Sequence, residues 1–194
     1  MSKRIAFLSA AAFGALALTA AVVAPVSAQD KMMKSEMSGE KTVMVGGAAM
    51  FPSKNIIQNA VNSKDHTTLV AAVKAAGLVE TLEGKGPFTV FAPTNAAFGK
   101  LPAGTVDTLV KPENKSTLTK ILTYHVVAGK LEASSLTDGK KLKTVEGEEL
   151  TVKKSGDKVM IVDAKGGSST VTIGNVNQSN GVIHVVDTVL MPAS

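Results

Sequence analysis

The chain has 194 residues, no cysteine, and a formal net charge of +5 from 21 Lys and Arg side chains against 16 Asp and Glu. Without cysteine it can form neither a disulfide nor a thiol nucleophile. Arg4 is the only arginine, so the chain lacks the bidentate donor that phosphates and base edges favour, and we expect no nucleic-acid partner.

The N-terminus has the three parts of an export signal. Lys3 and Arg4 precede an apolar run at residues 5–23, and Pro25 leads to small residues that end at Ala28. This order predicts a signal peptide at residues 1–28. A transmembrane anchor is the alternative, because the apolar run approaches the ~20 residues that span a bilayer. Pro25 and the mildly apolar composition favour cleavage after Ala28, with export to the periplasm or the cell exterior.

Cleavage would leave 166 of the 194 residues, with 19 lysines against 16 acidic residues and a net charge of +3. Residues 29–49 are polar and lack a period, which predicts a flexible leader. Residues 50–194 are expected to fold as one monomeric domain with no membrane span. The leader methionines suit Cu(I), but no histidine or cysteine accompanies them, so we expect no metal there; they are Met32, Met33, Met37 and Met44.

Two short helices are expected to open the domain. Ser53 can cap the first, which carries Ile56 and Ile57, and Asp65 can cap a second that ends at Gly77. Further on, residues 112–125 form the clearest amphipathic segment. Its apolar positions and a histidine recur at helical spacing, which places them on one buried face; they are Leu118, Ile121, Leu122 and His125.

Strand patterns fill most of the rest of the chain. Residues 88–91 alternate like a strand that Pro93 stops, and Thr94 or Asn95 can then cap a short helix. Residues 102–110 favour another helical piece. From Leu142 onward, short runs separated by turns predict a mostly antiparallel sheet, at residues 142–145, 150–153, 159–162, 170–173 and 182–190. Asn180-Gly181 should join the last two strands, and the fold class is α+β.

No segment carries a recognisable catalytic or metal-binding motif. The chain has no Gly-x-Ser-x-Gly elbow and no phosphate-binding loop. Its histidines, His66, His125 and His184, are about 60 residues apart and lack local metal-ligand spacing. We therefore expect no enzyme activity, no cofactor and no metal.

Two histidines fall where the pattern predicts burial. His125 ends an apolar helix face, and His184 is flanked by apolar residues on both sides of a strand. Buried imidazoles require hydrogen-bond partners. We expect each to close an internal polar network with Thr94, Asn95 or Asp187, which would make these residues structural.

Three segments together resemble the fasciclin domain family. They are Phe-Thr-Val-Phe-Ala-Pro-Thr-Asn-Ala-Ala-Phe at residues 88–98, Ile-Leu-Thr-Tyr-His-Val-Val at 121–127, and Asn-Gly-Val-Ile-His-Val-Val-Asp-Thr-Val-Leu-Met-Pro at 180–192. The resemblance runs from about Met50 to Pro192. It implies a wedge-shaped, mostly antiparallel sheet flanked by several short helices.

The resemblance also implies a function in adhesion. In animal members, adhesion to integrins is attributed to a Tyr-His motif with flanking aliphatic residues and to an Asp-Ile motif before the last strand. Tyr124 and His125 match the first, and the second position holds Asn175-Val176. The implied binding site is therefore Tyr124 and His125, with Ile121, Leu122, Val126 and Val127 beside them.

The leading hypothesis is an exported, non-enzymatic module that binds a cell-surface or matrix component. The alternative is an extracytoplasmic carrier of a small apolar ligand such as a pigment or lipid, bound in a groove lined by Val, Leu and Met. A hydrolase would require a nucleophile and a base from distant segments.

Overall fold

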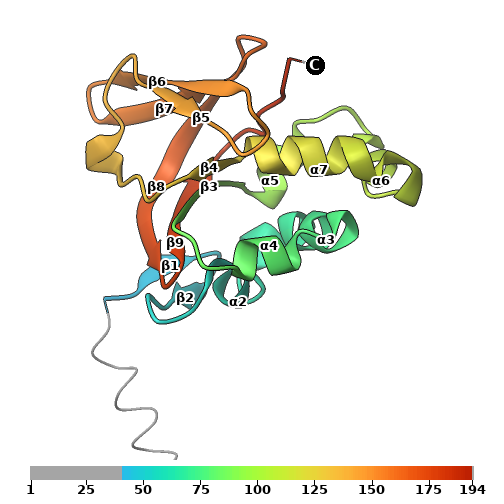
Figure 1. Ribbon diagram of the computed structural model, residues 1–194, viewed down its shortest axis with the longest axis horizontal. Helices are drawn as coiled ribbons and strands as arrows, with labels where there is room; N and C mark the ends of the chain where they lie inside the picture. Colours follow the sequence, from blue (N-terminus) through green and yellow to red (C-terminus); the bar gives the residue numbers. More distant parts are fainter. Residues whose placement is uncertain (1–40, 194) are drawn as a thin grey trace, which may run out of the picture. The chain divides into compact units, whose positions relative to one another are not determined.

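The computed structural model describes residues 41–193, which belong to one compact unit (Figure 1). The predicted signal peptide and the first part of the predicted leader lie outside the described residues. The helices are α2 (Ile56–Ala60), α3 (Thr67–Ala76), α4 (Val79–Glu83), α5 (Asn95–Gly99), α6 (Thr105–Leu109) and α7 (Lys115–Tyr124). Shorter 3-10 turns are η2 (Lys64–His66), η3 (Pro112–Asn114) and η4 (Ala133–Ser135).

The strands form a hairpin and a larger sheet. The hairpin pairs β1 (Val43–Val45) with β2 (Ala48–Met50). The sheet has seven strands in the order β4-β3-β9-β8-β7-β6-β5. Their bounds are β3 (Phe88–Pro93), β4 (Val126–Ala128), β5 (Lys141–Lys143), β6 (Glu149–Ser155), β7 (Lys158–Val162), β8 (Ser168–Gln178) and β9 (Gly181–Val186). Every pairing is antiparallel except that of β3 with β9, which confirms a mostly antiparallel sheet with flanking short helices.

The folded part begins earlier than the sequence suggested. The leader was predicted to extend to residue 49, whereas β1 and β2 form a hairpin within residues 43–50. Val45 and Met50 are buried in the main core. A hairpin of three-residue strands is stable only when it packs against something else, and its sequence carries no period long enough to reveal that packing.

Helix caps differ in part from those expected. Asn55, not Ser53, caps α2, and its side chain and that of Gln58 exchange hydrogen bonds with each other's backbone N–H. Gly77 ends α3 with a left-handed φ of 74°, as predicted. Asp65 lies in η2 and does not cap α3. The Thr68 N–H near the start of α3 is instead bound by the side-chain oxygen of the distant Asn95.

Strands β3 and β9 are the centre of the fold because both of their faces are buried. On one face, Val90 and Ile183 belong to a core shared with the helices. On the other face, Phe91 and Val186 belong to a second core enclosed by β5, β6 and β7. A parallel pair buried on both sides requires nearly continuous apolar sequence, and β9 is buried at every position.

The sheet curls so that its outer strands meet again. Val127 of β4 forms an isolated antiparallel bridge with Thr144, just after β5. The Val145 N–H donates to the Val126 carbonyl at 2.7 Å. The second core therefore lies inside the curl, while the outward faces of β5, β6 and β7 lie apart from α2 to α7 (Figure 1).

Two glycines allow β3 and β9 to meet closely at their starts. A Cβ on Gly181 would lie 2.0 Å from the Phe88 carbonyl oxygen, and one on Gly86 would lie 2.0 Å from the Asn180 oxygen. Asn180 precedes β9 and joins three segments, since its side chain donates to the Leu82 and Gly84 carbonyls and accepts from the Ile56 N–H. The Asn-Gly pair does mark the β8–β9 turn, and Gly181 is already the first residue of β9.

Replacing Gly181 with alanine should therefore destabilise the domain. The added methyl would meet backbone that cannot rotate away, so we expect a loss of about 2 to 3 kcal/mol in urea unfolding. Gly99→Ala is the matched control, because nothing lies within 4 Å of its Cβ position and it lies in α5. Equal urea midpoints for the two variants would contradict the close approach.

Candidate functional site

Helix α7 carries the predicted binding pair into the interior. Its apolar face, Leu118, Ile121 and Leu122, is buried, as the helical spacing predicts. Tyr124 is the last helical residue and His125 follows as the C-cap. The exposed fractions of Tyr124 and His125 are 0% and 2%, so neither side chain reaches the surface.

His125 is held as a neutral imidazole by two main-chain partners. Its Nδ1 lies 2.8 Å from the Ile121 carbonyl, to which it donates, and its Nε2 accepts from the Leu190 N–H at 3.0 Å. A second ring proton would face that N–H without an acceptor. Burial lowers the pKa of His125 to about 4, although the Ile121 carbonyl and the charge of Asp163 act in the opposite direction.

Tyr124 makes the companion contact. Its hydroxyl accepts from the Ala164 N–H at 2.9 Å, and burial raises the pKa of this hydroxyl. The adjacent Asp163 accepts from the Gly167 and Met191 N–H groups. Tyr124 and His125 therefore fix two distant segments to the end of α7, the turn after β7 and the stretch after β9.

His184 uses the same arrangement on β9. Its Nε2 lies 2.7 Å from the Leu131 carbonyl, to which it donates, and its Nδ1 accepts from the Asn175 N–H at 3.4 Å. Its ring stacks on Phe91 of β3 with the centroids 5.7 Å apart. Burial lowers the pKa of His184, and the Leu131 carbonyl opposes that shift. The expectation that the two histidines bond to Thr94, Asn95 or Asp187 is wrong, because their hydrogen-bond partners are main-chain groups.

Asn175 occupies the first position of the Asp-Ile motif. It has a left-handed φ of 57°, which asparagine tolerates better than most residues, and it lies where the β8 register shifts. Its side-chain oxygen accepts from the Ala133 N–H at 2.7 Å. The side chain thus ties the β8 irregularity to η4.

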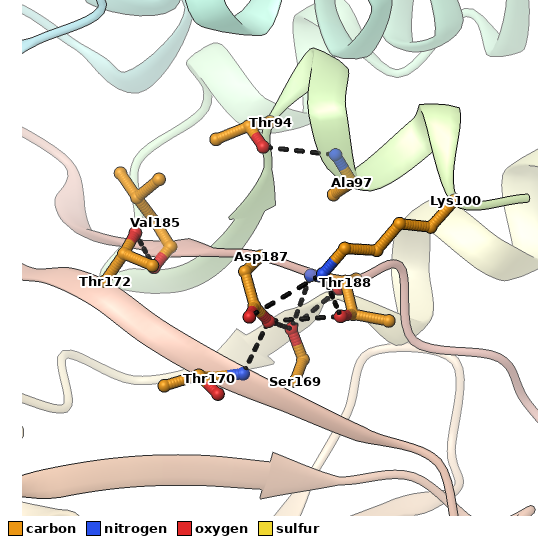
Figure 2. A network of polar contacts seen from close by, with 9 residues as sticks. All are labelled: Thr94, Ala97, Lys100, Ser169, Thr170, Thr172, Val185, Asp187 and Thr188. Atoms are coloured by element: carbon orange, nitrogen blue, oxygen red, sulfur yellow. Dashed lines mark hydrogen bonds and ion pairs between the residues drawn. The ribbon is translucent and has the colours of Figure 1, made fainter.

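Thr94, Asn95 and Asp187 each hold a local junction. Thr94 caps α5 by accepting from the Ala97 N–H. Asn95 accepts from the Thr68 N–H and donates to the Lys64 carbonyl, which joins α5 to the start of α3. Figure 2 shows Asp187 facing β8 near the Thr94 cap.

The Asp187 cluster joins the end of β9 to β8. Asp187 accepts from the Thr170 N–H at 2.8 Å, and the Ser169 hydroxyl donates to the Thr188 carbonyl at 2.7 Å. Lys100 reaches the Asp187 carboxylate at 3.7 Å (Figure 2). Partial burial acts to raise the pKa of Asp187, but the Thr170 N–H, the Thr188 hydroxyl and the Lys100 charge together lower it.

The residues flanking the predicted binding pair are also buried. Ile121, Leu122, Val126 and Val127 all belong to the two cores. The void beside them is lined by apolar side chains of α2, α3, α4 and β3, and its volume is about 30 Å³. That is room for about one water molecule, far below the ~300 Å³ at which small-molecule pockets begin.

An open groove of about 530 Å³ lies where the start of α2, the loop before β3 and the β8–β9 turn meet. Its lining includes Asn180 and Gln178, whose amide groups already bind the Leu82, Gly84 and Val176 carbonyls. Lys85 and Glu83 also line it. The groove is lined mainly by polar residues and glycines, and the amide groups of Asn180 and Gln178 are already used by the fold.

One Ser-His pair has the spacing of a nucleophile and its base. The Ser63 hydroxyl lies 2.9 Å from the His66 Nδ1. Both side chains are buried, at 2% and 3% exposed, so no substrate could reach the hydroxyl. Within residues 41–193, no group of three or more His, Asp or Glu could hold a metal ion, and no helix is long and apolar enough to cross a membrane.

Sequence reasoning missed two residues that organise this region. Asn59 is fully buried and bonds to the Phe51 backbone and to Gln178. The signal for it was a polar residue beside Ile56 and Ile57 in a short apolar helix. Asp163 gave a weaker signal, an acidic residue that directly follows an apolar strand and precedes a Gly-rich turn.

The fasciclin domain model matches residues 64–192. The chain belongs to the fasciclin domain family. This match covers all three segments that carried the resemblance, and the buried Tyr-His pair lies within it.

Bacterial proteins are similar to this chain in sequence, and an insect protein is similar to it in structure. The chain is 50% identical over 153 residues to protein sll1483 of Synechocystis sp., covering 79% of this chain and 82% of that one. It is 41% identical over 153 residues to the cell surface glycolipoprotein MPB83 of Mycobacterium bovis, covering 76% and 64%. A FAS1 domain pair from the insect cell adhesion molecule Fasciclin I superposes with a TM-score of 0.65 at 17% identity. The match covers 73% of this chain and 52% of that one, and it shows the shared fold.

The buried histidines should make stability depend on pH. Their unfolded pKa is 6.5, whereas burial lowers the folded pKa of His66 and His184, and that of His125 to about 4. The unfolded state binds more protons in this interval, so stability is complete above about pH 6.5 and falls as the pH drops towards 4. The shift of His125 alone corresponds to roughly 3 kcal/mol. Urea midpoints should fall steeply as the pH is lowered from 6.5 to 4. Midpoints that stay constant over this range would contradict the burial of the histidines in their neutral form.

His125→Ala should cost more stability than Tyr124→Phe. The alanine leaves the Leu190 N–H without its acceptor and empties buried space, for a loss of about 2 to 4 kcal/mol. Tyr124→Phe removes only the acceptor of the Ala164 N–H, for a loss of about 1 kcal/mol. Chemical unfolding at pH 7 measures both changes. An unchanged midpoint for His125→Ala would show that the imidazole does not hold the segment after β9.

Proposed function

We propose that the protein is an exported, non-enzymatic interaction module that attaches cells to a surface or matrix component. The observation that carries the proposal is that the polar side chains in the three family segments bond to the domain itself. The side chains of Tyr124, His125, His184 and Asn180 all hydrogen-bond to main-chain groups of the domain itself. These segments therefore build the domain, and recognition is left to its exterior.

The relatives support a place outside the cytoplasm. MPB83 is named a cell surface glycolipoprotein, and Fasciclin I is named a cell adhesion molecule. The N-terminal sequence has the features of a cleaved export signal. Export to the periplasm or the cell exterior agrees with these two names and with the N-terminal pattern. A monomer suffices for the proposed function.

The pair Tyr124 and His125 acts in this proposal through the fold. Because both side chains are buried, they position the turn after β7 and the segment after β9, and they do not touch a partner. Attachment should then survive a change that removes only the Tyr124 hydroxyl, provided that the domain remains folded.

The alternative, a carrier of a pigment or lipid, has less support. The apolar void beside Leu122 and Val126 has about 30 Å³, so a pigment or acyl chain would enter only if the helices separated from β3. Native protein purified from its producing cells and extracted with organic solvent should yield no stoichiometric apolar ligand.

Deleting the gene should reduce attachment and biofilm formation. Expression of the full-length wild type, or of Tyr124→Phe, should restore both in the deletion strain. The measurement is retained biomass on a surface, together with immunodetection of the exported protein. Normal attachment by the deletion strain would refute the proposed function. Failure of a folded, exported Tyr124→Phe variant to restore attachment would point to direct contact by this residue.

A further inference from the structure

One face of strands β5, β6 and β7 is turned to solvent. The register places Lys141 opposite Thr151, and Thr151 opposite Val162. Residues that lie directly opposite in a sheet share a face. The intervening residues, Leu142, Leu150, Val152, Val159 and Ile161, are buried in the second core. The face that carries Lys141 therefore points away from that core.

Four lysines form a diagonal line across this face. Lys143 and Lys141 are two positions apart on β5. Lys153 is two positions beyond Thr151, the residue opposite Lys141. Lys158 lies opposite Ser155 and two positions from Met160, the residue opposite Lys153. Each step of the line is a same-face neighbour, so successive Cβ atoms are roughly 7 Å apart. All four lysines are exposed.

The charge of this line is largely uncompensated. On this face of β5, β6 and β7, Glu149 is the acidic residue, and it pairs with Lys141 at 3.2 Å while both remain more than half exposed. Two further acidic residues lie at the margin of this face. Asp138 accepts from the Lys154 N–H, and Asp157 lies in the turn between β6 and β7, directly before Lys158. Within the three strands, four ammonium groups thus share this face with one carboxylate.

Protection of a sheet edge explains only part of the line. Lysines on an outer strand discourage pairing with another chain, and β5 is the outer strand in the sheet order. Lys153 and Lys158, however, lie on β6 and β7, which have partners on both sides. The line crosses the strands, whereas edge protection requires lysines only along one of them.

We propose that this lysine line (Lys141, Lys143, Lys153 and Lys158) binds an acidic polysaccharide, a chain of sugars that carry carboxylates. A linear polyanion matches a linear row of cations. Thr151 and Ser155 of β6 share this face, directly opposite Lys141 and Lys158, and supply hydroxyls for sugar hydroxyls to meet. The face has no aromatic residue on which a base could stack and no arginine. Its apolar content is limited to the half-buried Met160 and Val162, too little to insert into a lipid surface. The proposal rests on the proposed function and names its partner class.

Binding to alginate, in which every sugar carries a carboxylate, tests the proposal. The full exported chain should bind alginate and not neutral dextran in titration calorimetry, and added salt should weaken the binding. A triple variant, K143Q, K153Q and K158Q, should bind at least about tenfold more weakly and show a smaller salt dependence, because fewer counterions are released. Urea unfolding verifies that the variant is folded, which is expected since all three lysines are exposed.

The matched control changes three exposed lysines elsewhere, K64Q, K74Q and K111Q. It removes the same net charge as the first variant. Because these lysines lie outside the lysine line, its affinity for alginate should stay within about twofold of the wild type. An equal loss in both triple variants would overturn the lysine line as the site. Absence of alginate binding by the wild type would overturn the polysaccharide. If the wild type binds phosphatidylglycerol vesicles more strongly than alginate, and the first variant loses that binding, lipid headgroups replace the polysaccharide as the ligand.

Attachment assays separate this inference from the function on which it rests. If the deletion strain attaches normally, the proposed function is refuted, whether or not the purified protein binds alginate. If attachment is lost on deletion and fully restored by the K143Q, K153Q and K158Q variant, the function stands and the lysine line is refuted. If the control variant restores attachment and the K143Q, K153Q and K158Q variant does not, both the proposed function and the lysine line are supported.

Discussion

The parallel pairing of β3 with β9 is the constraint on which the rest of the structure depends. It joins a strand from the helical half of the domain to the last strand of the chain, and both cores lie against it. The pair can form only because Gly86 and Gly181 let backbones approach where any Cβ would collide. Burial on both faces then explains why these strands are almost wholly apolar.

Polar groups next to that pair are satisfied mainly by the backbone. His125 and His184 each donate to one carbonyl and accept from one N–H, so each is held in its neutral form. The contacts that fix the histidines also fix irregular segments, namely the stretch after β9 and the bulge of β8. This role accounts for the buried histidines in the family segments.

Buried polar residues and exposed charged residues have different roles in this arrangement. The buried Tyr-His pair and the Asp187 cluster shape the domain, while the outward face of the curled sheet carries exposed charge. Interaction through such a face requires no pocket and no reactive group. The fold itself tolerates change on this face as long as the two cores and the close glycine contacts persist.

Much of the fold could be predicted from the sequence, because periodicity reports burial directly. The amphipathic spacing in α7 predicted that His125 faces the core, and the last five strands were found in their order. The hairpin at residues 43–50 and the cap at Asn55 were not predicted, since short elements are stabilised by packing that leaves no period.

The sequence by itself determined the family, the α+β class and the absence of disulfides, since these depend on local pattern and residue type. Only the tertiary structure decided which groups meet. It paired His125 with Leu190 and His184 with Leu131, and it placed four lysines from three strands in one line. Those outcomes depend on strand register and on chain closure between distant residues, which local pattern does not specify.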